Sequence, residues 1–91
     1  MSADRVALIR RRLEQHFAPL ELEVQDDSAA HRGHAGARDG RGHFSVRIVA
    51  PAFAGLGRLE RHRMIYTALG ELMQEDIHAL SISASTPDEK P

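Results

Sequence analysis

The chain has 91 residues, a formal net charge of −1, six histidines and no cysteine. The lack of cysteine excludes disulfides, thiol nucleophiles, and any zinc ribbon or iron–sulfur cluster held by this chain's own thiolates. The near-neutral charge excludes a general attraction to nucleic acid or anionic membranes, so such binding would need a local basic patch.

The length and the hydrophobic fraction of 42% predict one folded domain over residues 1–91. No apolar run is long enough for a secretory signal or a membrane span, so we expect a cytoplasmic protein with no membrane partner. The sequence also has no P-loop, no HExxH pattern and no recognisable Ser–His–acid arrangement. We therefore expect a protein that is not an enzyme.

The first predicted element is a helix from about Ala3 to His16, with Ser2 as its N-cap. Its apolar residues recur at steps of three and four and form one stripe: Val6, Ile9, Leu13 and Phe17. Pro19 disfavours helical backbone angles at Ala18, so the helix should end there.

Two strands are predicted next, separated by a long segment without periodicity. The first strand has an apolar face and the second has another: Leu20, Leu22 and Val24, then Phe44, Val46 and Ile48. Residues 26–42 lie between them and contain four glycines and two histidines. A loop of this length without secondary structure is usually functional or disordered, so we predict a flexible loop.

A second long helix is predicted from about Arg58 to Gln74. Gly70 falls on its exposed side and should cost the helix about 1 kcal/mol relative to alanine. A third strand should run from Ile77 to about Ser83, and residues 86–91 should form a frayed polar tail.

The predicted order is therefore α-β-β-α-β, an α+β arrangement. The segment between the second and third strands is long enough for a right-handed crossover to a parallel neighbour. A three-stranded mixed sheet with both helices on one face would bury every apolar stripe.

The chemistry-bearing residues also occur in an ordered series of short motifs. The series is Asp27-Ser28, His31 and His34 in the glycine-rich loop, His43-Phe44, Phe53-Ala54-Gly55, Arg61-His62-Arg63, Ile77-His78-Ala79-Leu80 and Thr86-Pro87. This series resembles the BolA family from Phe17 to Glu89. The resemblance implies a class II KH-like fold and a non-enzymatic partner of monothiol glutaredoxins in [2Fe–2S] cluster handling. Some members of the family are also linked to DNA binding and transcriptional regulation.

A [2Fe–2S] cluster needs four ligands, and this chain can offer only nitrogen or oxygen donors. A shared site would meet that need, with one iron held by the partner's thiolate and a glutathione thiolate, and the other by two histidines here. His78 is the first expected ligand, because it matches the histidine of the family's Ile-His-Ala-Leu motif. By strand alternation alone, His78 would share a face with Leu80 and Ile82 and would be a core histidine.

The second expected ligand is His31, three residues after Ser28, where the resemblance places a variable histidine or cysteine ligand. His34 in the same loop is the alternate, and an ordinary solvated loop histidine is the simpler interpretation of either. His43 is expected to pack at the rim of its strand and His62 to have a structural role.

Arg58, Arg61 and Arg63 form the basic cluster of the second predicted helix. A solvated helix face is the simpler interpretation, and contact with DNA through the KH-like surface is the alternative function. We expect a monothiol glutaredoxin as partner, with DNA as a possible one, and a monomer or homodimer when no cluster is bound.

Overall fold

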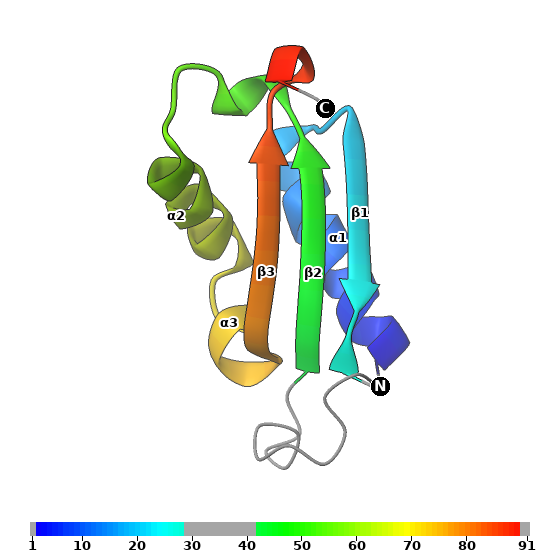
Figure 1. The fold of residues 1–91 in the computed structure, drawn as a ribbon. Helices are drawn as coiled ribbons and strands as arrows, with labels where there is room; N and C mark the ends of the chain where they lie inside the picture. The colour runs from blue at the N-terminus through cyan, green and yellow to red at the C-terminus, as the bar shows by residue number, and fades with distance from the viewer. Residues whose placement is uncertain (1, 29–41, 90–91) are drawn as a thin grey trace.

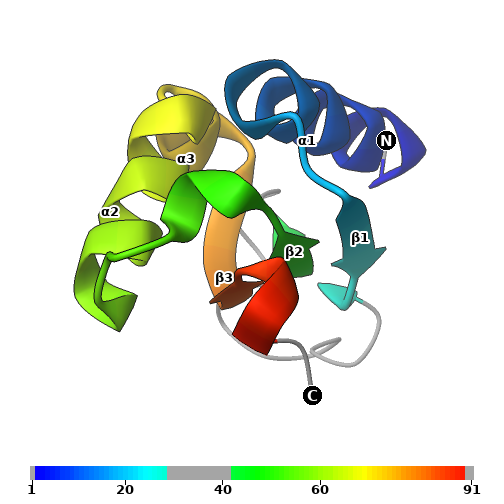
Figure 2. The same ribbon diagram turned by 90° about the horizontal axis from the view of Figure 1, so that it is seen from above.

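A computed structural model describes residues 2–28 and 42–89 of the chain. The helices lie on one face of a single sheet (Figures 1 and 2). They are α1 (Ser2–Phe17), α2 (Arg58–Leu69) and the short α3 (Leu72–Glu75), and the strands are β1 (Glu21–Asp26), β2 (Gly42–Val49) and β3 (Ile77–Ser85). Single 3-10 turns, η3 (Pro51–Phe53) and η4 (Pro87–Glu89), follow β2 and β3. No helix in these two ranges is long and apolar enough to cross a membrane.

The sheet has the order β1-β2-β3, with β1 antiparallel to β2 and β3 parallel to β2. The predicted mixed sheet and its crossover are therefore confirmed. The predicted 26–42 loop was too long, because Asp26 belongs to β1 and Gly42 begins β2. The predicted loop ligands His31 and His34 lie outside the described residues.

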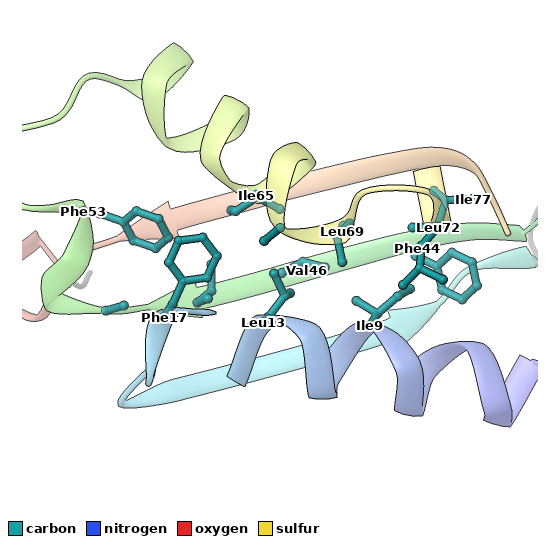
Figure 3. Packing of buried hydrophobic residues seen from close by; sticks show 13 residues of the cluster. Ile9, Leu13, Phe17, Phe44, Val46, Phe53, Ile65, Leu69, Leu72 and Ile77 are labelled. Atoms are coloured by element: carbon teal, nitrogen blue, oxygen red, sulfur yellow. The ribbon is translucent and has the colours of Figure 1, made fainter. Parts of the chain in front are cut away.

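The hydrophobic core lies between the helices and the sheet (Figure 3). It contains most of the predicted apolar stripe of α1, the inward face of β2, and the inner face of α2. Its central members are Ile9, Leu13, Phe17, Phe44, Val46, Ile48, Ile65 and Leu69. Full burial of each large apolar side chain contributes about 1.5–3 kcal/mol to folding.

The end of α1 is where the sequence placed it. Ala18 has a φ of +44°, a left-handed conformation, and its N–H donates to the carbonyl oxygen of Glu14 at 3.1 Å. Pro19 follows directly, so the chain leaves the helix there. Two boundary predictions were wrong: Ser2 is the first residue of the helix, and Leu20 precedes β1 with 65% of its surface exposed.

The second helix is interrupted, which the apolar pattern did not predict. Gly70 has a φ of +53° and a ψ of −125°, so α2 ends at Leu69 and the separate turn of α3 follows. Side chains with a Cβ rarely adopt this conformation. Gly70 is therefore a helix terminator here, and the prediction that it is a weak point within a continuous helix was wrong.

The predicted frayed tail was also wrong for the residues that are described. Thr86 is buried, and Pro87–Glu89 form the η4 turn. The Glu89 carboxylate accepts hydrogen bonds from the Thr86 N–H at 3.0 Å and from the Arg61 guanidinium. The tail is thus fastened to α2 through Arg61.

Candidate functional site

His78 lies at the start of β3, where the pairing with β2 is irregular. Gly42 pairs with Ile77, and the next residue of β2, His43, pairs with Ala79. His78 is therefore an extra residue of β3 at this point of the register. This bulge changes the alternation of the strand. Ile77 is buried in the core and His78 is exposed. The prediction that alternation groups His78 with the inward Leu80 and Ile82 was therefore wrong.

His43 is the described histidine that lies against His78. Their ring centroids are 5.1 Å apart, with the ring planes inclined by 50°. His43 alternates with the buried Phe44 and so belongs to the helix-free face of the sheet, and its Nε2 atom is buried. The two imidazoles form a pair, one ring exposed and the other half-buried. The sequence prediction treated His43 only as a packing residue of the strand rim.

The backbone of His43 is held by the chain that leaves β1. Its N–H donates to the Oγ atom of Ser28 at 3.1 Å, and its carbonyl accepts from the N–H of Asp27 at 2.7 Å. The side chain of Asp27 accepts a hydrogen bond from Ser45, and the Ser28 N–H donates to Asp26 Oδ1 at 2.8 Å. The described residues on either side of 29–41 therefore lie beside the histidine pair.

The residue before His43 is constrained by close packing. A Cβ atom on Gly42 would lie 2.7 Å from a ring carbon of the buried Phe44 and 2.9 Å from Ser28 Oγ. The Gly42 N–H donates to the carbonyl of Asp76 at 3.0 Å, which ties the start of β2 to the turn before β3. Glycine thus allows the two strand starts to approach each other closely.

The described residues alone do not make a complete metal site. In the part of the chain that the structure describes, no group of three or more His, Asp or Glu side chains is placed to hold a metal ion. The described residues offer the neighbouring imidazoles of His43 and His78, whose nitrogen atoms suit a borderline metal ion. One signal could have revealed the pair: parallel strands begin at the same edge of a sheet, and both histidines stand at strand starts.

Arg61 does not belong to an exposed basic cluster. The residue is 9% exposed, and its side chain donates to the carbonyl oxygens of Leu56 at 2.9 Å and Ala84 at 3.1 Å. The guanidinium also binds both oxygens of Glu89, at 2.5 and 2.9 Å. This hydrogen bonding, with that of the Thr86 N–H, lowers the pKa of Glu89 to about 2. The prediction of a three-arginine patch was wrong, because Arg61 joins α2 to β3 and η4.

Arg58 and Arg63, the other two predicted cluster residues, are exposed on α2. His62, next to Arg61 in the sequence, is half-buried, and its structural role stays a prediction. The basic surface of α2 therefore contains two arginines, with Glu60 between them in the sequence.

Comparisons with known proteins agree with this fold. The family model described as BolA-like protein matches residues 13–89. The chain is 48% identical over 86 residues to the SufE-like protein 1, chloroplastic/mitochondrial, of Arabidopsis thaliana, covering 89% of this chain and 23% of that protein. It is 40% identical over 83 residues to the DNA-binding transcriptional regulator BolA of Escherichia coli (strain K12), covering 87% and 76% respectively.

Solved structures give the same result. The BolA domain of SufE1 from Arabidopsis thaliana superposes with a TM-score of 0.84 and 45% identity, covering 94% of this chain and 95% of that domain. The chain spans 57% of the length of other plant and mammalian relatives that it matches. The order of elements, the mixed sheet and the family match lead to one conclusion: this chain belongs to the BolA-like family.

Proposed function

We propose that this chain is an iron–sulfur adaptor, without catalytic activity of its own, that shares a [2Fe–2S] cluster with a monothiol glutaredoxin. The observation that carries the proposal is the exposed His78 ring at the bulge that starts β3, with the His43 ring packed against it at a centroid distance of 5.1 Å. The cluster is cargo that the partner brings, so a partial ligand set is what such an adaptor needs.

His78 is the first proposed ligand, because the bulge exposes its ring at the end of the sheet. The family resemblance assigns the same histidine on independent grounds. Since the chain has no cysteine, the remaining thiolates come from the glutaredoxin and from glutathione. Histidine ligands on one iron give a Rieske-like donor set, which raises the reduction potential relative to an all-cysteine cluster.

His31 is the proposed second ligand. It follows Ser28, which is fixed beside His43, by three residues, and three residues span at most about 11 Å. His34, the alternate ligand, follows Ser28 by six residues, so the chain length allows it a greater distance from Ser28. His43 is the nearest described histidine, but its backbone is bonded on both sides and its Nε2 is buried. We assign His43 to the orientation of the His78 ring.

The proposal is tested by adding the apo protein to a monothiol glutaredoxin that holds a [2Fe–2S] cluster and glutathione, and recording visible circular dichroism. A new spectrum at a one-to-one ratio is the expected result. His78→Ala should abolish it. His16→Ala is the matched control, since His16 is exposed at the end of α1, near the opposite end of the sheet. An unchanged spectrum with the unmodified chain would refute the proposal.

Regulation by DNA binding is less well supported by this surface. Arg61 is occupied by Glu89 and by two carbonyl oxygens, which leaves Arg58 and Arg63 as the exposed cations of the predicted patch. With a net charge of −1, two arginines provide little of the phosphate neutralisation on which DNA affinity depends.

A further inference from the structure

The outer edge of β3 presents backbone groups for another strand. The Ala50 N–H donates to the carbonyl of Ser85 at 2.9 Å, so Ser85 directs its backbone groups toward β2. By alternation, Leu80, Ile82 and Ala84 direct theirs outward. The Ala84 carbonyl accepts from Arg61. The structure places no described residue in hydrogen-bonding contact with the outward groups of Leu80 and Ile82.

The two edge strands of the sheet, β1 and β3, differ in how well they are protected from pairing with another chain. β1 includes Glu21, Glu23 and Asp26, and charged side chains on an edge strand discourage pairing with another chain. β3 has nine residues, IHALSISAS, with no charged residue and no proline. A strand of this composition at an edge is suited to strand addition.

A groove lies between this edge and α2. It has a volume of about 580 Å³ and is lined by Ile82, Ser83 and Ala84 of β3 and by Arg58, Arg61 and His62 near the start of α2. Seen along the sheet, α2 extends outward beyond β3 (Figure 2). A chain that paired with β3 would therefore place alternate side chains against α2.

The charge of the groove is positive once the internal pairs are removed. Arg58, Arg61 and Glu89 all line the groove, and Glu89 is bound to Arg61, so these two charges offset each other. Arg58 is exposed and has no ion pair among the described residues. The positive end of the α2 helix dipole adds to its charge.

The side of α2 that lines the groove, called here the wall of α2, also carries exposed apolar side chains. Leu59 and Tyr66 are 63% and 42% exposed. They stand three and four residues from His62 and are therefore its neighbours on the helix surface. A ligand of this wall would meet the cation Arg58 and, on the same helix, the apolar side chains of Leu59 and Tyr66.

We propose that the β3 edge and the adjoining wall of α2 bind an extended acidic peptide segment of a partner protein, which adds to the sheet as a fourth strand. Its carboxylate pairs with Arg58, and its backbone pairs with Leu80 and Ile82. The groove lies toward the end of β3 opposite His78, and the proposal does not depend on the cluster.

A peptide fits this edge better than two other occupants. A nucleic acid has no backbone N–H groups to match those of β3, and it needs more cations than Arg58 and Arg63 provide. A second copy paired through β3 would bring both α2 helices onto the same face, where each extends beyond its own edge (Figure 2). A single extended segment avoids that collision.

The test is selection from a library of random dodecapeptides on the immobilised apo protein, with the Arg58→Glu protein as counter-selection. We expect proline-poor peptides that contain Asp or Glu. The strongest peptide should slow amide hydrogen exchange at Leu80 and Ile82. Arg58→Glu should weaken its binding about tenfold, because the substitution replaces an attraction to the peptide carboxylate with a repulsion between like charges.

Two further variants complete the design. Tyr66→Ala should also weaken the peptide, and Arg11→Glu should not. Arg11 is an exposed arginine of α1 that makes the same change of charge at a site away from the groove.

The proposal is overturned if no peptide prefers the unmodified protein to Arg58→Glu, or if the protected amides lie outside β3. The proposal is equally overturned if a single-stranded oligothymidine of twelve nucleotides displaces the peptide and slows amide exchange at Leu80 and Ile82 more strongly. Sedimentation that shows a dimer broken by peptide binding would assign the edge to a second copy instead.

Discussion

Arg61 and Glu89 form a two-pronged ion pair in which Nη1 lies 2.5 Å from Oε1 and Nη2 lies 2.9 Å from Oε2. The pair joins the first half of α2 to the last described residue of the chain. It explains both why η4 is fixed and why this arginine is not available to a ligand.

Glu89→Gln should lower the melting temperature at neutral pH by several degrees. The Arg61 hydrogen bonds lower the pKa of Glu89 to about 2 from an ordinary value of 4.5. A carboxyl with a lowered folded-state pKa stabilises the fold above its unfolded-state value, and this contribution is lost as the pH falls toward the folded-state value. The difference between the two proteins should therefore shrink between pH 4.5 and about 2.

Thermal melts across that pH range measure this difference. Glu75→Gln is the control, because Glu75 is an exposed carboxylate of α3. A constant difference between the Glu89→Gln and unmodified proteins from pH 7 to 2 would contradict the role of the ion pair.

Gly70→Ala should destabilise the protein by about 1–3 kcal/mol, because alanine is strained at a φ of +53° and a ψ of −125°. A continuous helix would give the opposite sign, a gain of about 1 kcal/mol. Urea unfolding distinguishes the two. Gly57→Ala, at a φ of −75°, is the control and should have a smaller effect.

Gly42→Ala should also destabilise the protein, by about 1–3 kcal/mol, because the added methyl overlaps the Phe44 ring within the core. Equilibrium unfolding in urea gives the loss. The cost of Gly42→Ala should be smaller in a Phe44→Leu background, which makes room at that place. Equal costs in the two backgrounds would show that the ring is not the obstacle.

Ala18→Gly should stabilise the protein by about 0.5–1 kcal/mol, because Ala18 holds a left-handed conformation at a φ of +44°. Ala7→Gly makes the same substitution inside α1, where it should cost about 1 kcal/mol. Opposite signs in parallel denaturation curves are expected. A loss of stability in both proteins would show that Ala18 is not strained.

The proposal that His31 is the second ligand can be tested by three substitutions in the circular dichroism assay. His31→Ala should remove the new spectrum, and His34→Ala should leave it intact. His43→Phe keeps a ring against His78 without a donor nitrogen. It should preserve the spectrum if His43 only orients its neighbour. Loss of the spectrum in His43→Phe, with His31→Ala unaffected, would assign the second position to His43.

The sequence predicted those features that depend on local periodicity. The stripe of α1 and the alternation of β2 are regular, and each fixes which face is buried. Pro19 gave the end of α1 for the same local reason. The crossover followed from the length of the segment before β3.

The features it missed depend on contacts between distant residues. The bulge that exposes His78 arises from pairing with β2, and the burial of Arg61 arises from Glu89. Gly70 is a break because the chain must turn from α2 into α3 there, which an apolar pattern does not show. His31 and His34 stay predictions, since they lie outside the described residues.

The hydrogen bonds of Asp27 and Ser28 to the His43 backbone affect which changes of sequence the protein can tolerate. Ser28 and Asp27 bond to His43 directly, so the chain before residue 29 and after residue 41 is joined independently of what lies between. Loop closure is insensitive to length, costing only about 0.6 kcal/mol for each doubling. Insertions, deletions or a different donor side chain in that segment would leave the strand register and His78 unchanged. The proposed ligand His78 is thus held by the sheet, and the proposed ligand His31 belongs to a segment that can vary without moving His78.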